Sequence, residues 1–419
     1  MKSKLFTEYQ LGPITLRNRV IRSAAFENMA DHNAPSQALQ DYHVSVAKGG
    51  VGMTTIAYCA VDKTGVSFDG QLYVHKEIKP AMKKMVDAIH KEGAKVSIQL
   101  GHCGNMTHRR TCGCTPMGPS NGFNLYSPTF YRGITKEEIQ TIVKHYGDAV
   151  DFCRDCGIDC VEIHCGHAYL ISQFLNPSLN RRKDEYGGSL ENRMRFMNEV
   201  MEEVMKRAKD DMAVVVKMNM TDGYRGGMSM EDGLEVAKSL KNHGVHGIVL
   251  SAGTVSHTPM LILGGAMPLK TLAHYMDPWQ FWWLKLGLAI GGRIVIPTSP
   301  YHELFFLDWA KKFKKEIPDA PFIYVGGVQS RKGAEEVLNA GFELFQLGHV
   351  LVEDPAFVNH MKEGDMDYKS QCKRSNYCVG RMYTLDMQCH KCVKDMPPKL
   401  QKEVDKAEKV NASLNNWSK

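Results

Sequence analysis

The sequence predicts an α/β fold: a (β/α)8 TIM barrel with an inserted excursion and a short cysteine-containing C-terminal tail. Short apolar runs typical of buried strands alternate with longer helical patterns, and this alternation indicates a parallel sheet. Eight such runs occur, which is the number of strands that closes a TIM barrel. They span residues 20–25, 51–57, 95–100, 160–164, 214–219, 247–251, 322–325 and 344–347.

Glycines support this assignment. Most of the runs follow a glycine one to four residues upstream, where it can end the preceding helix. A doubly wound sheet is the alternative, but that fold usually has a glycine-rich fingerprint after its first strand, and none follows residues 20–25. The glycines are Gly49, Gly50, Gly93, Gly157, Gly244 and Gly341.

Two segments extend the bare barrel. Residues 254–320 are too long for one loop and helix, so we expect an excursion, either over the active-site face or as a packed side element. We assign residues 1–360 to the barrel and residues 361–419 to a cysteine-rich and helical tail. The tryptophans of the excursion are Trp279, Trp282 and Trp283.

The composition is that of an ordinary globular protein. Its 419 residues are 43% hydrophobic and 23% charged, which leaves ample length for a large core. The net charge of +6 is spread over 52 basic and 46 acidic residues without a basic block, so we expect no nucleic-acid partner. The sequence shows neither a signal-peptide core nor a membrane-spanning run, and its 12 cysteines indicate reduced thiols. We expect a cytoplasmic protein without a membrane partner, and a homo-oligomer is compatible with the sequence.

Residues 160–169 carry the clearest chemical signal. The predicted strand ends on His164, and His167 and Tyr169 follow at once, at the end of a strand where barrel enzymes keep their chemistry. A histidine pair can polarise a carbonyl oxygen as negative charge develops, and a phenol can donate a proton. The alternative is two loop histidines and a packing tyrosine. A metal site would need further ligands, which nothing nearby provides.

Glycines after the last two strands indicate an anion site. Gly326 and Gly327 follow the seventh strand, and Gly348 and His349 follow the eighth. Turns at these places let backbone N–H groups approach a phosphate. Simple turn chemistry is the alternative.

Two polar residues within strands indicate contacts with a ligand. Gln99 lies inside an otherwise apolar strand, so its buried amide needs partners, either the edge of a heterocycle or the barrel wall. Lys217 lies near the end of the fifth strand, where it can face a phosphate or an electron-rich ring, or lie in solvent.

The cysteines form two sets. Cys153 and Cys156 make a C-x-x-C motif in the barrel without a second pair at zinc-binding spacing, so we assign them a structural role. The tail contains four more, which could hold an iron–sulfur cluster or zinc, but their spacing matches neither common pattern. They are Cys372, Cys378, Cys389 and Cys392.

Taken together, these motifs resemble the Old Yellow Enzyme family of FMN-dependent ene-reductases, in the branch related to 2,4-dienoyl-CoA reductase. The resemblance runs from residue 5 to about residue 354. The most specific match is VEIHCGHAYLISQFLNP at 161–177, followed by NRRKDEYGGSLENRMRF at 180–196. The other matches are RNRVIRSAAFE at 17–27, IQLGHCG at 98–104, YVGGV at 324–328 and LGHVLVEDP at 347–355.

The resemblance implies FMN at the C-terminal face of the barrel and NAD(P)H as hydride donor. His164 and His167 would hold the carbonyl of a small-molecule enone, and Tyr169 would be the proton donor. The residues that would line the flavin ring are Ala24, Ala25, Ala57, Gln99 and Lys217. Those that would hold its phosphate are Gly326, Gly327, Gly348 and His349.

The expected function is therefore NAD(P)H-dependent reduction of the C=C bond of an α,β-unsaturated carbonyl compound. The aromatic excursion is compatible with a bulky enone, such as a steroid or a bile-acid-like compound. One alternative is another FMN barrel oxidoreductase, of the dihydroorotate or dihydrouridine type, which would need a catalytic cysteine or serine on a loop. A second is a flavin-binding protein without turnover.

Three positions depart from the family pattern. His349 replaces the arginine that usually follows the last phosphate glycine, which weakens one charge-assisted contact. Phe26 stands where a threonine or cysteine often tunes the flavin. Ser375 stands at the place of a cluster cysteine, and since serine is a poor cluster ligand, we expect no iron–sulfur cluster.

Overall fold

The computed structural model describes residues 3–125, 128–276, 278, 282–294, 296–299 and 301–414. Eight parallel strands close into a barrel, which confirms the predicted fold, and each strand overlaps the run predicted for it. In spatial order they are β11 (Cys160–Cys165), β12 (Ala213–Asn219), β13 (Gly247–Ser251), β14 (Phe322–Val325), β15 (Leu344–Leu347), β3 (Val20–Arg22), β6 (Met53–Ala60) and β7 (Lys95–Gly101).

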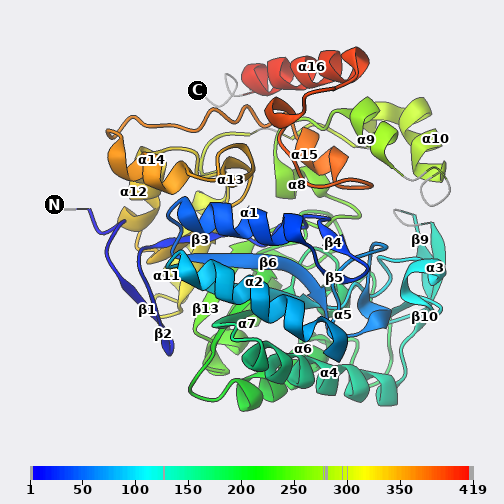
Figure 1. Cartoon of the computed structure of the whole chain (residues 1–419). Helices are drawn as coiled ribbons and strands as arrows, with labels where there is room; N and C mark the ends of the chain where they lie inside the picture. The colour runs from blue at the N-terminus through cyan, green and yellow to red at the C-terminus, as the bar shows by residue number, and fades with distance from the viewer. Residues whose placement is uncertain are drawn as a thin grey trace.

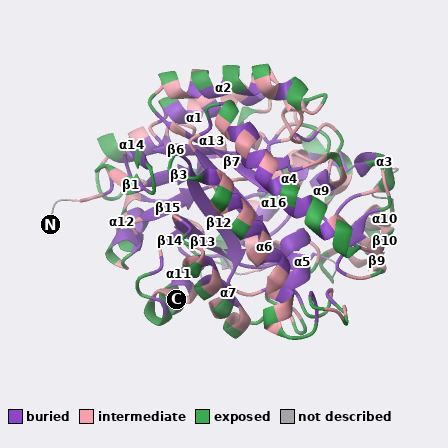
Figure 2. Ribbon diagram, turned by 90° about the horizontal axis from the view of Figure 1, so that it is seen from below, coloured by how far each residue is buried: buried purple, intermediate pink, exposed green. Residues whose placement is uncertain are grey.

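Helices alternate with the strands and form a ring around the barrel, with their outer faces exposed and the strands buried (Figures 1 and 2). Gly93 and Gly157 lie between a helix and the next strand with φ of 77° and 79°, a left-handed conformation that side chains disfavour. The ring consists of α1 (Gln37–Lys48), α2 (Lys79–Lys91), α4 (Lys136–Asp155), α6 (Leu190–Ala208), α7 (Met230–Asn242), α11 (Leu307–Glu316), α12 (Arg331–Asn339) and α14 (Phe357–Glu363).

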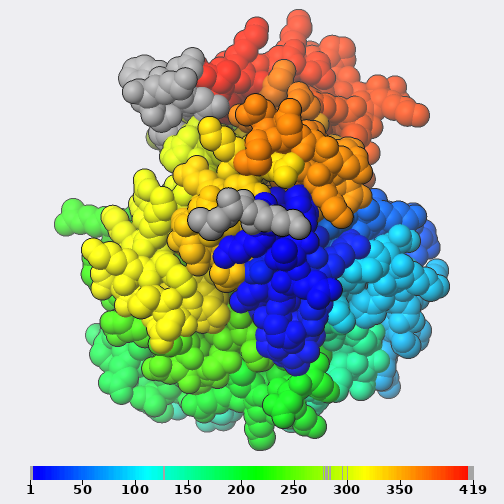
Figure 3. Space-filling view, turned by 90° about the vertical axis from the view of Figure 1, so that its left-hand side faces the viewer, coloured from blue at the N-terminus to red at the C-terminus, as the bar shows by residue number. Residues whose placement is uncertain are grey.

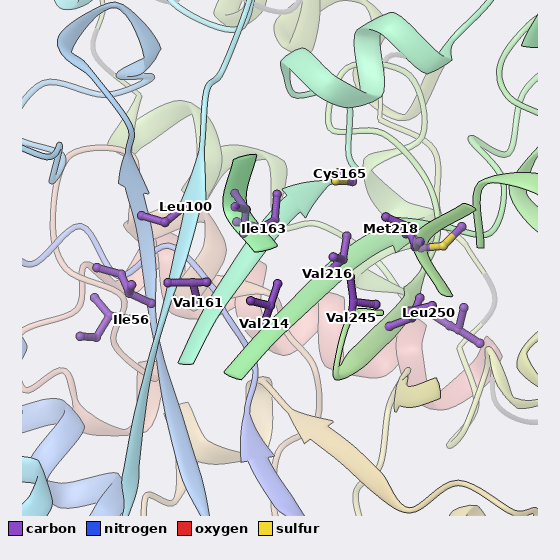
Figure 4. Close-up of a cluster of buried hydrophobic side chains, with 14 of the residues drawn as sticks. Ile56, Leu100, Val161, Ile163, Cys165, Val214, Val216, Met218, Val245 and Leu250 are labelled. Carbon is purple, nitrogen blue, oxygen red and sulfur yellow. The ribbon is translucent and has the colours of Figure 1, made fainter. Parts of the chain in front are cut away.

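Strand side chains alternate between the helices and the barrel interior. Val161 and Ile163 of β11 belong to the large apolar cluster between strands and helices (Figure 4). Glu162 and His164 therefore point into the barrel, and His164 is in register with Lys217 of β12. This alternation brings polar side chains to the interior of an otherwise apolar sheet.

The two ends of the barrel are closed differently. A hairpin of β1 (Tyr9–Leu11) and β2 (Ile14–Leu16) packs against the N-terminal ends of the strands. The opposite end is covered by the excursion and the tail, which form a separate upper layer in Figures 1 and 3. The excursion thus takes the first of its two expected arrangements, over the C-terminal mouth.

The excursion and the tail pack on each other. α9 (Leu269–Tyr275) lies against α15 (Tyr377–Arg381) and α16 (Pro398–Leu414), and the Tyr275 and Tyr377 hydroxyls are 2.9 Å apart. Trp282 is half exposed on α10 (Trp282–Gly291), while Trp279 and the side chain of Trp283 lie outside the described residues. α8 (Pro259–Leu263) lies at the barrel mouth, where Ile262 and Leu263 line cavities.

The remaining elements are short. They are β4 (Ala30–Asp31), β5 (Ala34–Pro35), η1 (Lys63–Gly65), η2 (Lys76–Ile78), α3 (Arg109–Cys112), β8 (Met117–Gly118), β9 (Gly122–Asn124), β10 (Thr129–Gly133), α5 (Leu170–Leu175), η3 (Gly292–Ile294), α13 (His349–Glu353) and η4 (His390–Cys392). All 12 cysteines are free thiols. Within the ranges given above, no helix has the length and apolarity needed to cross a bilayer.

Candidate active site

His164, His167 and Tyr169 lie together just past the C-terminal end of β11. The ring of His164 is 4.5 Å from that of Tyr169 and 5.2 Å from that of His167, measured between centroids. His167 and Ala168 have φ of 58° and 66°, and this tight turn directs the three rings toward one place. All three line a cavity of about 220 Å³, here called the histidine cavity. The structure thus brings together the three side chains singled out from the sequence.

Both histidines are neutral at physiological pH. Burial lowers the pKa of His164 well below its usual value, and burial, followed by the charge of Lys217, lowers the pKa of His167 to about 3. The Gly166 backbone N–H donates to His164 Nδ1 at 3.3 Å, so the ring hydrogen lies on Nε2. His167 Nε2 lies 2.8 Å from Ser251 Oγ. Each neutral imidazole therefore carries one N–H.

Replacing His167 with asparagine is expected to make folding less sensitive to acid. The pKa of His167 falls from 6.5 to about 3 on folding, so the unfolded chain binds the proton more tightly. The contribution of His167 to the free energy of unfolding is fully present above its pKa in the unfolded chain. It is lost as the pH falls toward its pKa of about 3 in the folded protein. At pH 5 the loss is about 2 kcal/mol for this one histidine. Urea unfolding at neutral pH and at pH 5 measures it, and equal acid sensitivity in wild type and His167→Asn would contradict the shift.

The carboxylate of Glu162 organises the barrel interior beneath the histidines. Gln99 Nε2 donates to Glu162 Oε1 at 2.7 Å, and Lys217 Nζ lies 3.0 Å from the same oxygen. Gln346 Nε2 donates to Oε2 at 2.7 Å. Lys217 is only 3% exposed, so it is not a solvated charge, and burial lowers its pKa. Gln99 braces the barrel wall through Glu162 and also lines the histidine cavity.

Sequence reasoning missed Glu162, Gln346 and Ser23. Ser23 Oγ donates to Gln346 Oε1 at 2.9 Å and accepts from Lys217 Nζ at 3.2 Å, which completes the buried network. The signal that identified Gln99, a polar residue within an apolar strand, is also present at Glu162 and Gln346.

A second cavity of about 150 Å³, here called the glycine cavity, shares several walls with the histidine cavity. Gly326 and Gly327 line this cavity. Gly327 has a φ of 84°, and a Cβ added to it would lie only 2.8 Å from the side chain of Phe305. A Cβ on Gly348 would meet nothing within 4 Å, so this glycine borders open space. The walls common to both cavities include Ala24, Ala25, Lys217, Gly348 and His349.

Two departures from the family pattern lie at these cavities. Phe26 and Ala57 both line the histidine cavity. The Phe26 ring stacks on that of Phe68, with ring centroids 4.9 Å apart. His349 lies where the cavities meet, and burial, with the nearby charge of Arg374, lowers its pKa to about 3. The neutral imidazole of His349 therefore adds no positive charge for a phosphate.

The donor set of the two cavities fits FMN. Gln99 and Lys217 present an amide and an ammonium group that match the polar edge of an isoalloxazine ring, and the alanines leave room for its plane. The glycine turns leave room for backbone N–H groups to meet a phosphate. With FMN in this position, its ring would lie beside His164 and Tyr169.

Three of the tail cysteines line a small cavity that shares His349 and Arg374 with the glycine cavity. Cys372, Cys378 and Cys389 line this cavity of about 20 Å³ together with Ser375, while Cys392 is exposed. In the described part of the chain, no three His, Cys, Asp or Glu side chains are arranged to hold a metal ion.

Comparison with known sequences identifies the family. Residues 4–259 match the NADH:flavin oxidoreductase / NADH oxidase family. A 4,4'-dithiodibutanoate disulfide reductase of Rhodococcus erythropolis is 32% identical over 381 residues, which are 91% of this chain and 93% of that protein. An NADH oxidase of Thermoanaerobacter brockii is 30% identical over 90% of this chain, and the match spans only 53% of that protein.

Solved structures share the fold. A 2-naphthoyl-CoA reductase complex superposes with a TM-score of 0.79 at 23% identity, over 97% of this chain and 58% of that one. An Old Yellow Enzyme homologue from Zymomonas mobilis superposes with a TM-score of 0.69 at 19% identity, over 94% of this chain and 99% of that one. The chain therefore belongs to the NADH:flavin oxidoreductase / NADH oxidase family, the Old Yellow Enzyme family, and is an FMN-dependent NAD(P)H oxidoreductase.

Proposed function

We propose that this enzyme is an ene-reductase, which uses NAD(P)H to reduce the C=C bond of an α,β-unsaturated carbonyl compound. One observation carries the proposal: two neutral imidazoles and a phenol converge on the cavity whose donor set fits the flavin ring. Bound FMN supplies hydride transfer, first from NAD(P)H and then to the β carbon of the enone. The protein supplies orientation, polarisation and the proton.

His164 and His167 act on the carbonyl oxygen. The Nε2–H of His164 is fixed by the contact of Nδ1 with the Gly166 backbone, and Ser251 orients His167. Neutral donors held in a buried site need little reorganisation as enolate charge grows on the oxygen, which is the condition for electrostatic stabilisation of a transition state.

Tyr169 delivers the proton to the α carbon. Its neighbour Tyr58 lines the same cavity, with the two rings 5.2 Å apart, but the Tyr58 hydroxyl already donates to the Gly65 carbonyl. We assign the transferable proton to Tyr169, whose ring lies 4.5 Å from that of His164, one of the two proposed carbonyl donors.

We further propose a bulky apolar enone as substrate. A third cavity of about 240 Å³, here called the apolar cavity, shares Val255, Ile262, Leu263, Val379 and Met382 with the histidine cavity. Its other walls are largely aliphatic, and the tryptophans on which the sequence-based expectation rested do not contribute described side chains to it. The residues that line it beyond the shared wall include Leu125, Met267, Leu272, Met276 and Ile296.

Anaerobic turnover with a series of enones tests this proposal. The purified enzyme, NADH or NADPH, and enones of increasing size, from cyclohexenone to a steroid enone, are incubated and the products analysed by mass spectrometry. We expect saturated ketones, with kcat/KM rising with apolar size. The disulfide 4,4'-dithiodibutanoate, the substrate in the name of the Rhodococcus relative, is assayed separately alongside the enones. NAD(P)H consumption that no enone accelerates, without saturated product, would refute the ene-reductase assignment.

We propose that the tail holds no iron–sulfur cluster. Ser375 shares a cavity with three cysteines, but cluster iron strongly prefers thiolates. Iron and acid-labile sulfide, measured on anaerobically purified protein, are expected to lie far below one per chain. The Ser375→Cys variant is the matched comparison, because it supplies the missing thiol. About four irons per chain in the wild type would contradict this expectation.

A further inference from the structure

A buried arginine of the C-terminal tail reaches the glycine cavity. Arg374 is only 5% exposed and lines this cavity with Gly326, Gly327 and Gly348. Its guanidinium carbon lies 3.8 Å from the centroid of the Tyr301 ring, and the Tyr301 hydroxyl donates to the Gly327 carbonyl at 3.2 Å. The guanidinium is therefore fixed beside the turn that follows β14.

This buried charge has no counter-ion among the residues that the structure describes. Arg374 Nη2 donates to the Leu263 carbonyl at 3.0 Å, while its buried Nε has no hydrogen-bond partner. Lys217, the other permanent cation on the cavity wall, is already paired with Glu162 at 3.0 Å. Burying an unpaired guanidinium is costly, so its presence indicates an anionic ligand that completes the site.

The segment that carries Arg374 is held from three sides. Asn376 Nδ2 donates to the Gly264 carbonyl at 3.0 Å and the Ala266 carbonyl at 3.2 Å, and Asn376 Oδ1 lies 3.2 Å from His349 Nε2. Asn411 of α16 donates to the Arg374 carbonyl. The excursion, the barrel and the last helix thus fix the backbone from which the guanidinium extends, so it is oriented before a ligand binds.

We propose that Arg374 binds the phosphate of FMN and takes over the role of the cation that is absent at His349. A guanidinium can meet phosphate oxygens with two parallel hydrogen bonds, and the Arg374 side chain lines the cavity together with the glycine turns. The tail is then part of the cofactor site. The inference depends on FMN binding and not on which compound the enzyme reduces.

Flavin binding to the full-length protein tests this assignment. After removal of the bound flavin, wild type, Arg374→Gln and Lys373→Gln are titrated with FMN and with riboflavin, which lacks the phosphate, and fluorescence quenching gives each Kd. We expect Arg374→Gln to raise the Kd for FMN about 10- to 100-fold and to leave the Kd for riboflavin unchanged. Inorganic phosphate should compete with FMN in the wild type and much less in this variant.

Lys373→Gln is the matched control. It removes a positive charge from the adjacent residue, whose side chain is 68% exposed and does not line the glycine cavity. An unchanged Kd for FMN in Arg374→Gln would overturn the inference. Equal weakening of FMN and riboflavin would also overturn it, because that result indicates loss of local structure. Equal Kd values for riboflavin and FMN in the wild type would also overturn the inference, because the phosphate would then contribute nothing to binding. Enone turnover enters none of these measurements, so their outcome is independent of the ene-reductase proposal.

Discussion

Replacing Tyr169 with phenylalanine is expected to slow the oxidation of the reduced enzyme by an enone about 10²- to 10⁴-fold. The change removes the proposed proton donor and keeps the ring that packs 4.5 Å from His164. Reduction by NAD(P)H needs no proton from this phenol, so its rate should change little. Anaerobic stopped-flow absorbance at the flavin band measures the two half-reactions separately.

Tyr58→Phe is the control for this experiment. Tyr58 lines the same cavity, but its hydroxyl is engaged by the Gly65 carbonyl, so both half-reactions should stay within a few-fold of wild type. Equal losses in the two half-reactions of Tyr169→Phe would instead indicate that the tyrosine only packs against the ring system.

Replacing His164 with leucine is expected to slow the oxidative half-reaction about 100-fold. One donor to a developing oxyanion is commonly worth about 3 kcal/mol, and leucine fills a similar volume without an N–H. Because burial holds the pKa of His164 well below its usual value, the wild-type rate should show no histidine ionisation between about pH 6 and 8. Stopped-flow traces with a saturating enone, repeated across this range, give both results.

His164→Asn separates polarisation from packing. Asparagine retains an N–H donor, so it should recover part of the rate that leucine loses. If both variants lose the same rate, the contribution of His164 is its packing against Tyr169 rather than its hydrogen bond.

The barrel strands could be predicted because they are buried on both faces and therefore apolar, and because glycines mark where helices end before them. Two strand boundaries differ from the prediction. The first strand was predicted over 20–25 but ends at Arg22, because Ala24 and Ala25 leave the sheet to line the cavities. The second extends to Ala60, with a register shift between Ile56 and Cys59 that sequence periodicity does not reveal.

The local part of the site was predictable and the long-range part was not. His164, His167 and Tyr169 lie within six residues, so a single strand end brings them together. The network around Glu162 forms only when the barrel closes, since Gln346 reaches it from 184 residues away. Arg374 reaches the glycine cavity because the tail folds back over the mouth, and nothing in its local sequence indicates that return.

The proposed function requires a flavin beside His164, His167 and Tyr169 that passes electrons to an enone. The most direct test is the visible spectrum of the purified enzyme, titrated without oxygen, first with NAD(P)H and then with an enone. We expect a yellow protein with one FMN per chain, whose colour is bleached by NAD(P)H and restored by an equimolar enone with release of the saturated ketone. A protein that takes up no FMN, or one whose bleached flavin no enone reoxidises, would contradict it.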